Sequence, residues 1–450
     1  MLQPGQRITL KVVDLSHDGA GVGRIGNLVV FVTGALPDEQ VEVEIIEVRK
    51  NFSRGKLLSV LEASPERINP PCPVYGSCGG CQLQHLNYRA QLNYKKERIG
   101  NALARIGNLK DISVNPALGM ENPWRYRNKV QLHAIQIKGQ LKLGYYQSGS
   151  RQLIPIEDCL LLPEGFASLI KILETELNKQ GVLAFNPKTK TGILKHIVIK
   201  QSEATGEMMV IFVSARADFP QGKDVSKKLM AENPYIKSVV HNINSSSREI
   251  LGRDFRLLAG SDRIKEKLGS LEFLISPPAF FQVNTKQATR LCKKVVECAN
   301  LSGKEIVFDL YCGTGTLSLW LAGNAKKVYG METNPVAIKD AKANAVLNKI
   351  NNAEFIAGQV EKILPELLSK NIVPDLIVLD PPRQGVALSV LEEIAKAAPP
   401  SLIYVSCDSG TLARDLGILK DFSYQTQEVQ PVDMFPQTSH VECVIEIQKV

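Results

Sequence analysis

Long apolar runs are missing from this 450-residue sequence. Nowhere do 18 apolar residues follow one another, which disfavours a membrane-spanning helix. Residues 1–13 lack the apolar core of a signal peptide, because Arg7 and Lys11 flank the only apolar run there. We therefore expect a cytoplasmic protein that does not associate with membranes. The hydrophobic fraction of 44% and the charged fraction of 22% are those of a globular chain, whose length predicts about two to four domains.

Histidine and cysteine are scarce, with six and nine residues. Five of the histidines are isolated in the sequence, which favours packing or surface roles over metal binding: His17, His85, His133, His196 and His241. An odd number of cysteines without a short secreted framework disfavours paired disulfides. Any clustered cysteines are therefore better explained by metal binding or catalysis.

Three cysteines do cluster, because Cys72, Cys78 and Cys81 form a C-x5-C-x2-C motif. A fourth ligand must come from elsewhere in the chain, and Cys159 is the best candidate. Structural zinc usually takes two tight pairs of ligands, whereas four cysteines are the usual ligands of an iron–sulfur cluster. The spacing favours a cluster and leaves zinc as the alternative.

The positive charge is concentrated in one segment. Residues 64–160 contain 13 Lys and Arg against 6 Asp and Glu, whereas residues 1–63 contain 7 against 8. Within the basic segment, residues 85–107 are typical of a basic amphipathic helix, and aromatic and cationic residues alternate over 124–130 (WRYRNKV). Aromatic rings can stack on exposed bases and cations can bind phosphates, so we expect RNA there. A solvated face without a partner is the alternative.

The first 62 residues have the pattern of a small β-barrel. Apolar and polar residues alternate over 8–62, and turn-forming clusters separate four or five short strands. The stretch 18–24 (DGAGVGR) resembles the opening hairpin of TRAM domains, which are small OB-like barrels attached to RNA-modifying enzymes. A glycine-rich hairpin without that role is the alternative.

Two further regions follow the proline-rich boundary at 65–73. Residues 130–274 have a mixed α+β pattern, with strands at 196–200 and 208–213 and a helix at about 166–177. A helix over 285–300, capped by Thr285, precedes an alternation of strands and helices that is typical of a doubly wound α/β sheet. Its strands are expected at 305–310, 327–331, 353–357, 375–380 and 402–406.

A cofactor site is expected at the carboxyl edge of this sheet. The first strand runs into Tyr311 and the sequence CGTG, whose glycines let the backbone approach a ligand closely. The next strand ends at Glu332, 17 residues after Gly315, where an acid can accept hydrogen bonds from a ribose. A glycine loop followed by such an acidic residue occurs both in NAD enzymes and in S-adenosylmethionine (SAM) methyltransferases.

Downstream residues separate these two classes. Asp380 begins a DPPR turn at a strand end, similar to the (D/N)PP-aromatic motif of nitrogen methyltransferases, and Cys407 follows the next strand. Methylation of an amine requires no thiol, whereas C5 of a pyrimidine becomes nucleophilic only after a thiolate adds to C6. A base must then remove the C5 proton, and Glu442 or, alternatively, His440 is available.

Together these motifs resemble the RNA uridine-5 methyltransferase family, and most closely its TRAM-containing, iron–sulfur members that methylate 23S ribosomal RNA. The resemblance covers essentially the whole chain and includes the motif FFQVN at 280–284. It implies that Cys407 is the nucleophile and Glu442 the base. It also implies that four residues contact SAM, namely Gln282, Tyr311, Glu332 and Asp380. It implies further that four cysteines ligate a 4Fe–4S cluster, namely Cys72, Cys78, Cys81 and Cys159.

The resemblance further implies a domain division. We expect a TRAM β-barrel at 1–63, a central α+β iron–sulfur and RNA-binding domain at 64–92 and 120–266, and a Rossmann-like SAM methyltransferase domain at 93–119 and 267–450. The substrate is expected to be ribosomal RNA, with transfer RNA as the alternative, and the protein a monomer.

Two other classes of function remain open. A cytosine-C5 methyltransferase would use similar chemistry, but that class usually has its nucleophile after a proline, whereas Ser406 precedes Cys407. A non-catalytic RNA-binding protein built on TRAM is the other alternative. The intact residues Gly313, Glu332 and Glu442 argue against it.

Overall fold

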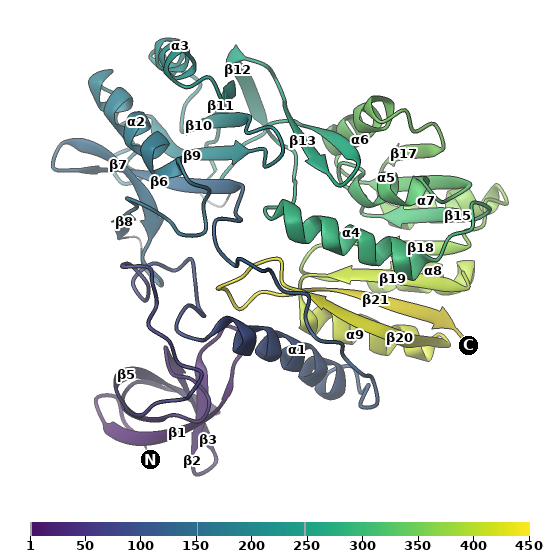
Figure 1. Ribbon diagram of the computed structural model, residues 1–450, viewed down its shortest axis with the longest axis horizontal. Helices are drawn as coiled ribbons and strands as arrows, with labels where there is room; N and C mark the ends of the chain where they lie inside the picture. The colour runs from purple at the N-terminus through teal and green to yellow at the C-terminus, as the bar shows by residue number, and fades with distance from the viewer. Residues whose placement is uncertain (1, 151, 247–248) are drawn as a thin grey trace.

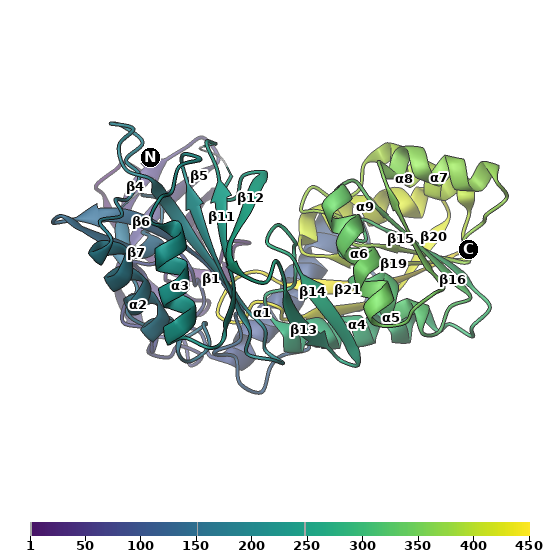
Figure 2. The ribbon, with the colours of Figure 1, turned by 90° about the horizontal axis from the view of Figure 1, so that it is seen from above.

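The computed structural model describes residues 2–150, 152–246 and 249–450. Figure 1 shows three parts: a small barrel at the lower left, a sheet with two helices at the upper left, and a larger sheet layered with helices on the right. The view from above in Figure 2 shows the central and C-terminal sheets side by side. None of the helices in the described ranges is long and apolar enough to cross a membrane.

The N-terminal barrel closes with five strands in the order β1-β2-β3-β5-β4. Alternate residues of each strand point inward, so Val30, Val32, Val41 and Val43 form a fully buried core. This confirms the predicted barrel. The strands are β1 (Arg7–Leu15), β2 (Gly21–Ile25), β3 (Leu28–Thr33), β4 (Gln40–Val48) and β5 (Phe52–Glu62).

The central sheet has seven strands in the order β12-β11-β10-β9-β6-β7-β8, and two helices pack against one of its faces. The strands expected at 196–200 and 208–213 and the helix at about 166–177 are all present. The elements are β6 (Lys129–Ile137), β7 (Gln140–Tyr146), β8 (Leu153–Pro155), α2 (Phe166–Lys179), β9 (Leu194–Gln201), β10 (Met208–Ser214), α3 (Gly222–Glu232), β11 (Ile236–Ile243) and β12 (Asp254–Gly260).

The C-terminal sheet, in the order β17-β16-β15-β18-β19-β21-β20, begins with five parallel strands and ends with two antiparallel ones. The parallel strands lie where the sequence predicted them: β15 (Ile306–Leu310), β16 (Lys327–Glu332), β17 (Ala353–Ala357), β18 (Leu376–Leu379) and β19 (Ser401–Ser406). The alternation pattern did not predict the antiparallel pair β20 (Tyr424–Val432) and β21 (Glu442–Lys449).

Helices cover both faces of this sheet, and a hairpin precedes them. The hairpin consists of β13 (Ile264–Leu268) and β14 (Leu271–Ile275). The helix α4 begins one residue earlier than a Thr285 cap would place it. Its N-cap is Asn284, whose side chain accepts a hydrogen bond from the Gln287 backbone amide. The helices are α4 (Thr285–Ala299), α5 (Thr316–Ala322), α6 (Pro335–Leu347), α7 (Val360–Ser369), α8 (Leu388–Ala397) and α9 (Ser409–Asp421).

The helix α1 (Tyr88–Arg105) connects the cysteine motif to the C-terminal sheet. It packs against α9, and its residues Ile99 and Leu103 belong to the apolar core between them. The helix was expected over 85–107, but it ends at Arg105, and Ile106 is the C-cap residue and 57% exposed. The helix also carries a lysine, Lys95, that is fully buried.

Lys95 forms an ion pair with Asp433 in the loop between β20 and β21. The Lys95 Nζ atom lies 2.5 Å from Asp433 Oδ1 and 3.0 Å from the Phe435 carbonyl oxygen, and both charged side chains are fully buried. Asp433 also accepts a hydrogen bond of 2.8 Å from the Tyr88 hydroxyl. A buried charge is tolerated only when it is paired and hydrogen-bonded, and here each charge satisfies the other.

We predict that Lys95→Met destabilises the protein by about 3–5 kcal/mol, because it leaves the Asp433 carboxylate buried and unpaired. The free energy of unfolding can be measured by urea denaturation followed by circular dichroism. The less buried neighbour, Lys96→Met, is the control and should change stability little. Lys95→Met/Asp433→Leu should recover part of the loss, and an equal loss in the Lys95 and Lys96 variants would contradict the role of the pair.

Candidate active site

The glycine loop after β15 has the shape expected for a cofactor site. Gly315 has a left-handed φ of 83°, and an added Cβ would lie only 2.9 Å from the Phe355 ring, so a side chain would not fit there. Glu332 at the end of β16 accepts hydrogen bonds from the Gly313 amide at 3.3 Å and the Asn334 amide at 2.8 Å. The structure therefore places Glu332 directly beside the loop that contains Tyr311.

The segment that contains Gln282 is anchored from the central sheet. The fully buried amine of Lys200 donates to three backbone carbonyls of residues 276–279, at 2.8–3.1 Å. Asn128 donates to the Gln282 carbonyl oxygen at 3.1 Å and to the Thr285 hydroxyl at 3.0 Å. The first bond holds the backbone of Gln282 and the second holds the Thr285 side chain, so the Gln282 side chain is left for other contacts.

Cys407 directly follows β19, and Glu442 begins the neighbouring strand β21. β19 and β21 are antiparallel, and Ser406 pairs with Cys443. Cys407 follows Ser406 directly and Glu442 begins β21, so the two occupy the next opposed positions. Because side chains alternate along a strand, Cys443 points to the other face, where it is only 2% exposed.

The electrostatic environment couples these two residues to Asp380. Burial, with the Asp380 charge second, raises the pKa of Glu442 to about 8. Burial raises the pKa of Asp380 to about 7. The pKa of Cys407 is raised by burial, then by Glu442 and Asp380, and is opposed by Arg383. The structure thus brings together three of the residues that the sequence singled out.

Glu442 has the properties of a proton acceptor. It is 6% exposed, and its Oε2 atom has no hydrogen-bond partner among the residues that the structure describes. A general base functions best when its pKa lies near the working pH, which a pKa of about 8 satisfies. A buried carboxylate beside a thiol can therefore hold or accept one proton.

His440, the alternative base, lies in a different setting. Its ring contacts Phe435 edge-on, and the Arg383 guanidinium lies 3.4 Å from its ring nitrogens. Burial, then Arg383 and other nearby cations, lower the pKa of His440 to about 4. The imidazole is therefore neutral at neutral pH, and it faces a cavity that the cysteines also line.

That cavity, of about 310 Å³, brings the four cysteines together. Cys72, Cys78, Cys81 and Cys159 all line it, although 78 residues separate the last two in the sequence. Burial, and after it the charges of the other three thiols, raise the pKa of Cys81 to about 12, as expected for close neighbours. The donor set is four thiols, which is the set that iron–sulfur clusters use.

The aromatic and cationic stretch at 124–130 corrects one expectation. Tyr126 was expected to offer a stacking face, but it is 6% exposed and donates to the Pro436 carbonyl oxygen at 2.9 Å. Arg125 pairs with Asp158 at 2.7 Å. Arg127 is left to line the cysteine cavity. Aromatic spacing alone could not show that the Tyr126 hydroxyl has a buried partner.

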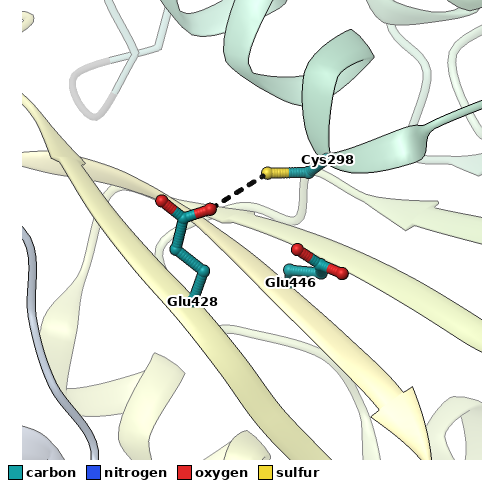
Figure 3. Close-up of side chains that lie close together, drawn as sticks. All are labelled: Cys298, Glu428 and Glu446. Atoms are coloured by element: carbon teal, nitrogen blue, oxygen red, sulfur yellow. Dashed lines mark hydrogen bonds between the residues drawn. The ribbon is translucent and has the colours of Figure 1, made fainter.

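A second group of potential ligands lies away from this site, on α4, β20 and β21 (Figure 3). Ligand atoms of Cys298, Glu428 and Glu446 lie within 4.8 Å of one another. However, Lys294 lies 2.9 Å from one Glu428 oxygen, and Asn115 donates to the other at 2.6 Å. The ammonium already neutralises the carboxylate, so we interpret this group as a link between α4, β20 and residue 115.

Sequence reasoning missed the residues that hold the loop 433–440. Lys95 and Asp433 were not singled out, and neither was Gln91, whose side-chain amide donates to Gln437 Oε1 and accepts from the Gln437 backbone N–H. A signal was available for Lys95. It lies four residues after Gln91 and four before Ile99, so a helix over 85–107 places it on the same face as the apolar Ile99.

Comparison with known families agrees with this geometry. Residues 256–450 match the family tRNA (Uracil-5-)-methyltransferase, and residues 2–58 match the TRAM domain. The crystal structure of Pyrococcus abyssi tRNA (uracil-54, C5)-methyltransferase in complex with S-adenosyl-L-homocysteine is similar, with a TM-score of 0.80 and 28% identity. The similarity covers 98% of this chain and 99% of that one.

Curated relatives match over nearly the whole length. A protein of Clostridium tetani, named an RNA methyltransferase, is 44% identical over 97% of this chain and 95% of its own. A Bacillus cereus protein of the same name is 43% identical with the same coverage. Together with the glycine loop, Asp380 and Cys407, the family match and the similar structure bound to S-adenosyl-L-homocysteine support SAM as the cofactor. The chain belongs to the SAM-dependent RNA (uracil-5-)-methyltransferase family and carries an N-terminal TRAM domain.

Proposed function

We propose that this protein methylates C5 of a specific uridine in a structured RNA, with Cys407 as nucleophile and Glu442 as base. The observation that carries the proposal is the position of Cys407 directly after β19, beside the start of β21, where Glu442 has a pKa of about 8 and an oxygen without a hydrogen-bond partner among the described residues. A target base inside a duplex is out of reach, so the uridine is flipped out of its stack.

The chain's residues perform the proton and sulfur steps. The thiolate of Cys407 bonds to C6 of the uracil, which moves electron density to C5. SAM, when bound, supplies the methyl group that C5 takes. Glu442 then accepts the C5 proton, the C5–C6 double bond re-forms and the bond from sulfur to C6 breaks. The thiolate is released unchanged, and the reaction gives off one proton overall.

Residues from four segments would hold the cofactor. Glu332 would accept hydrogen bonds from the ribose hydroxyls, and Gln282, Tyr311 and Asp380 would contact the rest of SAM. The positions of Glu332 beside the glycine loop and of Asp380 beside Cys407 support this assignment.

We also propose that Cys72, Cys78, Cys81 and Cys159 hold a 4Fe–4S cluster. Among the described residues, no three of these sulfurs lie within 4.8 Å of one another. One tetrahedral zinc ion with bonds of about 2.3 Å would require a closer set. A cluster spreads four thiolates over several irons and suits the wider cavity.

The substrate is ribosomal RNA in our first assignment, following the 23S-specific members that the chain resembles. Transfer RNA is the second candidate, because the similar Pyrococcus abyssi enzyme is named for uracil 54 of tRNA. The two are separated by incubating the protein with labelled SAM and unmodified ribosomal or transfer RNA, and mapping the labelled nucleotide. Label on cytosine, or on neither RNA, would contradict the proposed reaction.

Cys407→Ala should abolish methylation, by at least about 1,000-fold, because no other group can prime C5. SAM binding, measured by calorimetry, should persist. The matched control is Cys298→Ala, which removes a thiol on α4 and should leave turnover near the original rate. Retained turnover in the Cys407 variant would refute the nucleophile.

Glu442→Gln should trap a covalent protein–RNA adduct. The thiolate still adds and the methyl group still moves, but without a base the C5 proton stays and the sulfur cannot leave. The adduct is measured as a band shifted on a denaturing gel that depends on both SAM and RNA. The same adduct from His440→Gln, with none from Glu442→Gln, would transfer the base role to His440.

Purification without oxygen should give a brown protein with iron and sulfide in equal amounts. Cys159→Ser should lose the colour and the iron, because it removes one of the four ligands, while Cys298→Ser should keep both. Absorption spectra and metal analysis measure this directly. A colourless protein that contains one zinc ion would refute the cluster.

A further inference from the structure

Among the described residues, the helices α2 and α3 pack against one face of the central sheet. On the opposite face, residues of β9, β10 and β11 pack against the hairpin β13–β14 and Ala279, whereas β6 and β7 contribute no residue to that cluster. Alternate residues of β6, including Val130, Leu132 and Ala134, pack against α2 and α3. Figures 1 and 2 show both helices on the side turned away from the rest of the molecule. Because side chains alternate, Lys129, Gln131 and His133 of β6 lie on the opposite face, and all three are partly exposed.

The strands on either side of β6 add two rings to this face. His133 pairs with His196 on β9, so both point the same way. Tyr146 on β7 stacks on His133 with ring centroids 3.9 Å apart and 22° between planes, while His196 contacts His133 edge-on at 4.8 Å. We name His133, Tyr146 and His196 the ring platform.

The ring platform is formed by neutral rings. Burial lowers the pKa of His133, and burial followed by the charge of His133 lowers that of His196 to about 3. At neutral pH neither imidazole carries a charge, so the platform offers flat aromatic surface without repelling a neighbouring cation. The nearby cations, Lys129 and Arg127, lie toward the start of β6.

The row of β6 leads from the platform to the active site. Lys129 is at its near end, and Arg127, two residues earlier, lines the cavity that also contains Arg383 and His440. From Lys129 to His133 a strand advances about 14 Å, the length of about four stacked nucleotides. Two cations and one stacking platform therefore follow one line away from the catalytic edge.

We infer that this face binds single-stranded RNA next to the target uridine, with one base stacked on His133 and Tyr146 and the phosphates facing Lys129 and Arg127. Single-stranded RNA is recognised in this way on open sheet faces, by bases stacked on aromatic rings and cations along the backbone. A protein partner fits less well, because the row alternates cations and polar groups and has no apolar centre. The inference rests on the proposed function, since it places a flanking nucleotide of the same substrate.

The test uses the full-length protein and a short oligouridylate that carries one 5-iodouridine. Irradiation should cross-link the oligonucleotide to Tyr146 or His133, as mapped by mass spectrometry of the labelled peptide. Tyr146→Leu should weaken oligouridylate binding about tenfold, which is about 1.4 kcal/mol. Tyr146→Phe should restore it, because the ring remains.

The matched control is Tyr235→Leu, which removes an exposed tyrosine beside β11, outside the platform, and should leave binding unchanged. SAM affinity should be equal in all variants, which shows that the fold is intact. Wild-type affinity of Tyr146→Leu for the oligonucleotide, or cross-links only elsewhere, would overturn the inference. Binding is measured without SAM, so a failure of the proposed methylation would leave this result readable.

Discussion

A buried loop without regular structure needs partners for its backbone groups, and the loop 433–440 meets this requirement with the help of distant segments. Its carbonyl groups accept from the Lys95 amine, the Tyr126 hydroxyl, the amides of residues 82 and 83, and the Arg98 guanidinium. The loop leads directly into Glu442. The position of the proposed base therefore depends on hydrogen bonds from α1, from the start of the central sheet and from the cysteine motif.

This arrangement connects the proposed base with the cavity that the four cysteines line. Cys81 immediately precedes the two amides that bond the Gln437 carbonyl oxygen at 3.1 and 3.0 Å. Thr438 and His440 line the cavity of the four cysteines. Under the proposed assignment, a cluster in that cavity supports the loop from one side while the Lys95–Asp433 pair supports it from the other. A structural contribution of this kind requires no electron transfer.

The sequence predicts the elements that obey local rules. Strand ends in a parallel sheet meet at one edge, so Asp380 and Cys407 could be expected together before any coordinates were known. Alternation likewise predicted the barrel. Local rules fail where a polar group finds a distant partner: Lys95 interrupts an apolar face because Asp433 lies opposite, and Tyr126 is buried because its hydroxyl reaches Pro436. The antiparallel strands β20 and β21 were also not predicted, because the alternation of strands and helices ends before them.

The contacts of the loop 433–440 have a consequence for how the protein is made. Residues 82–98 leave the ribosome long before their partners, which lie about 340 positions later in the chain. Until synthesis is nearly complete, the Lys95 ammonium has no counter-ion and the apolar face of α1 has no sheet to cover. Domains generally fold as units from the N-terminus, so the barrel can form early, whereas α1 must wait. This edge of the sheet is therefore assembled last, and a nascent chain that already carries a folded barrel does not yet have the proposed nucleophile and base in place.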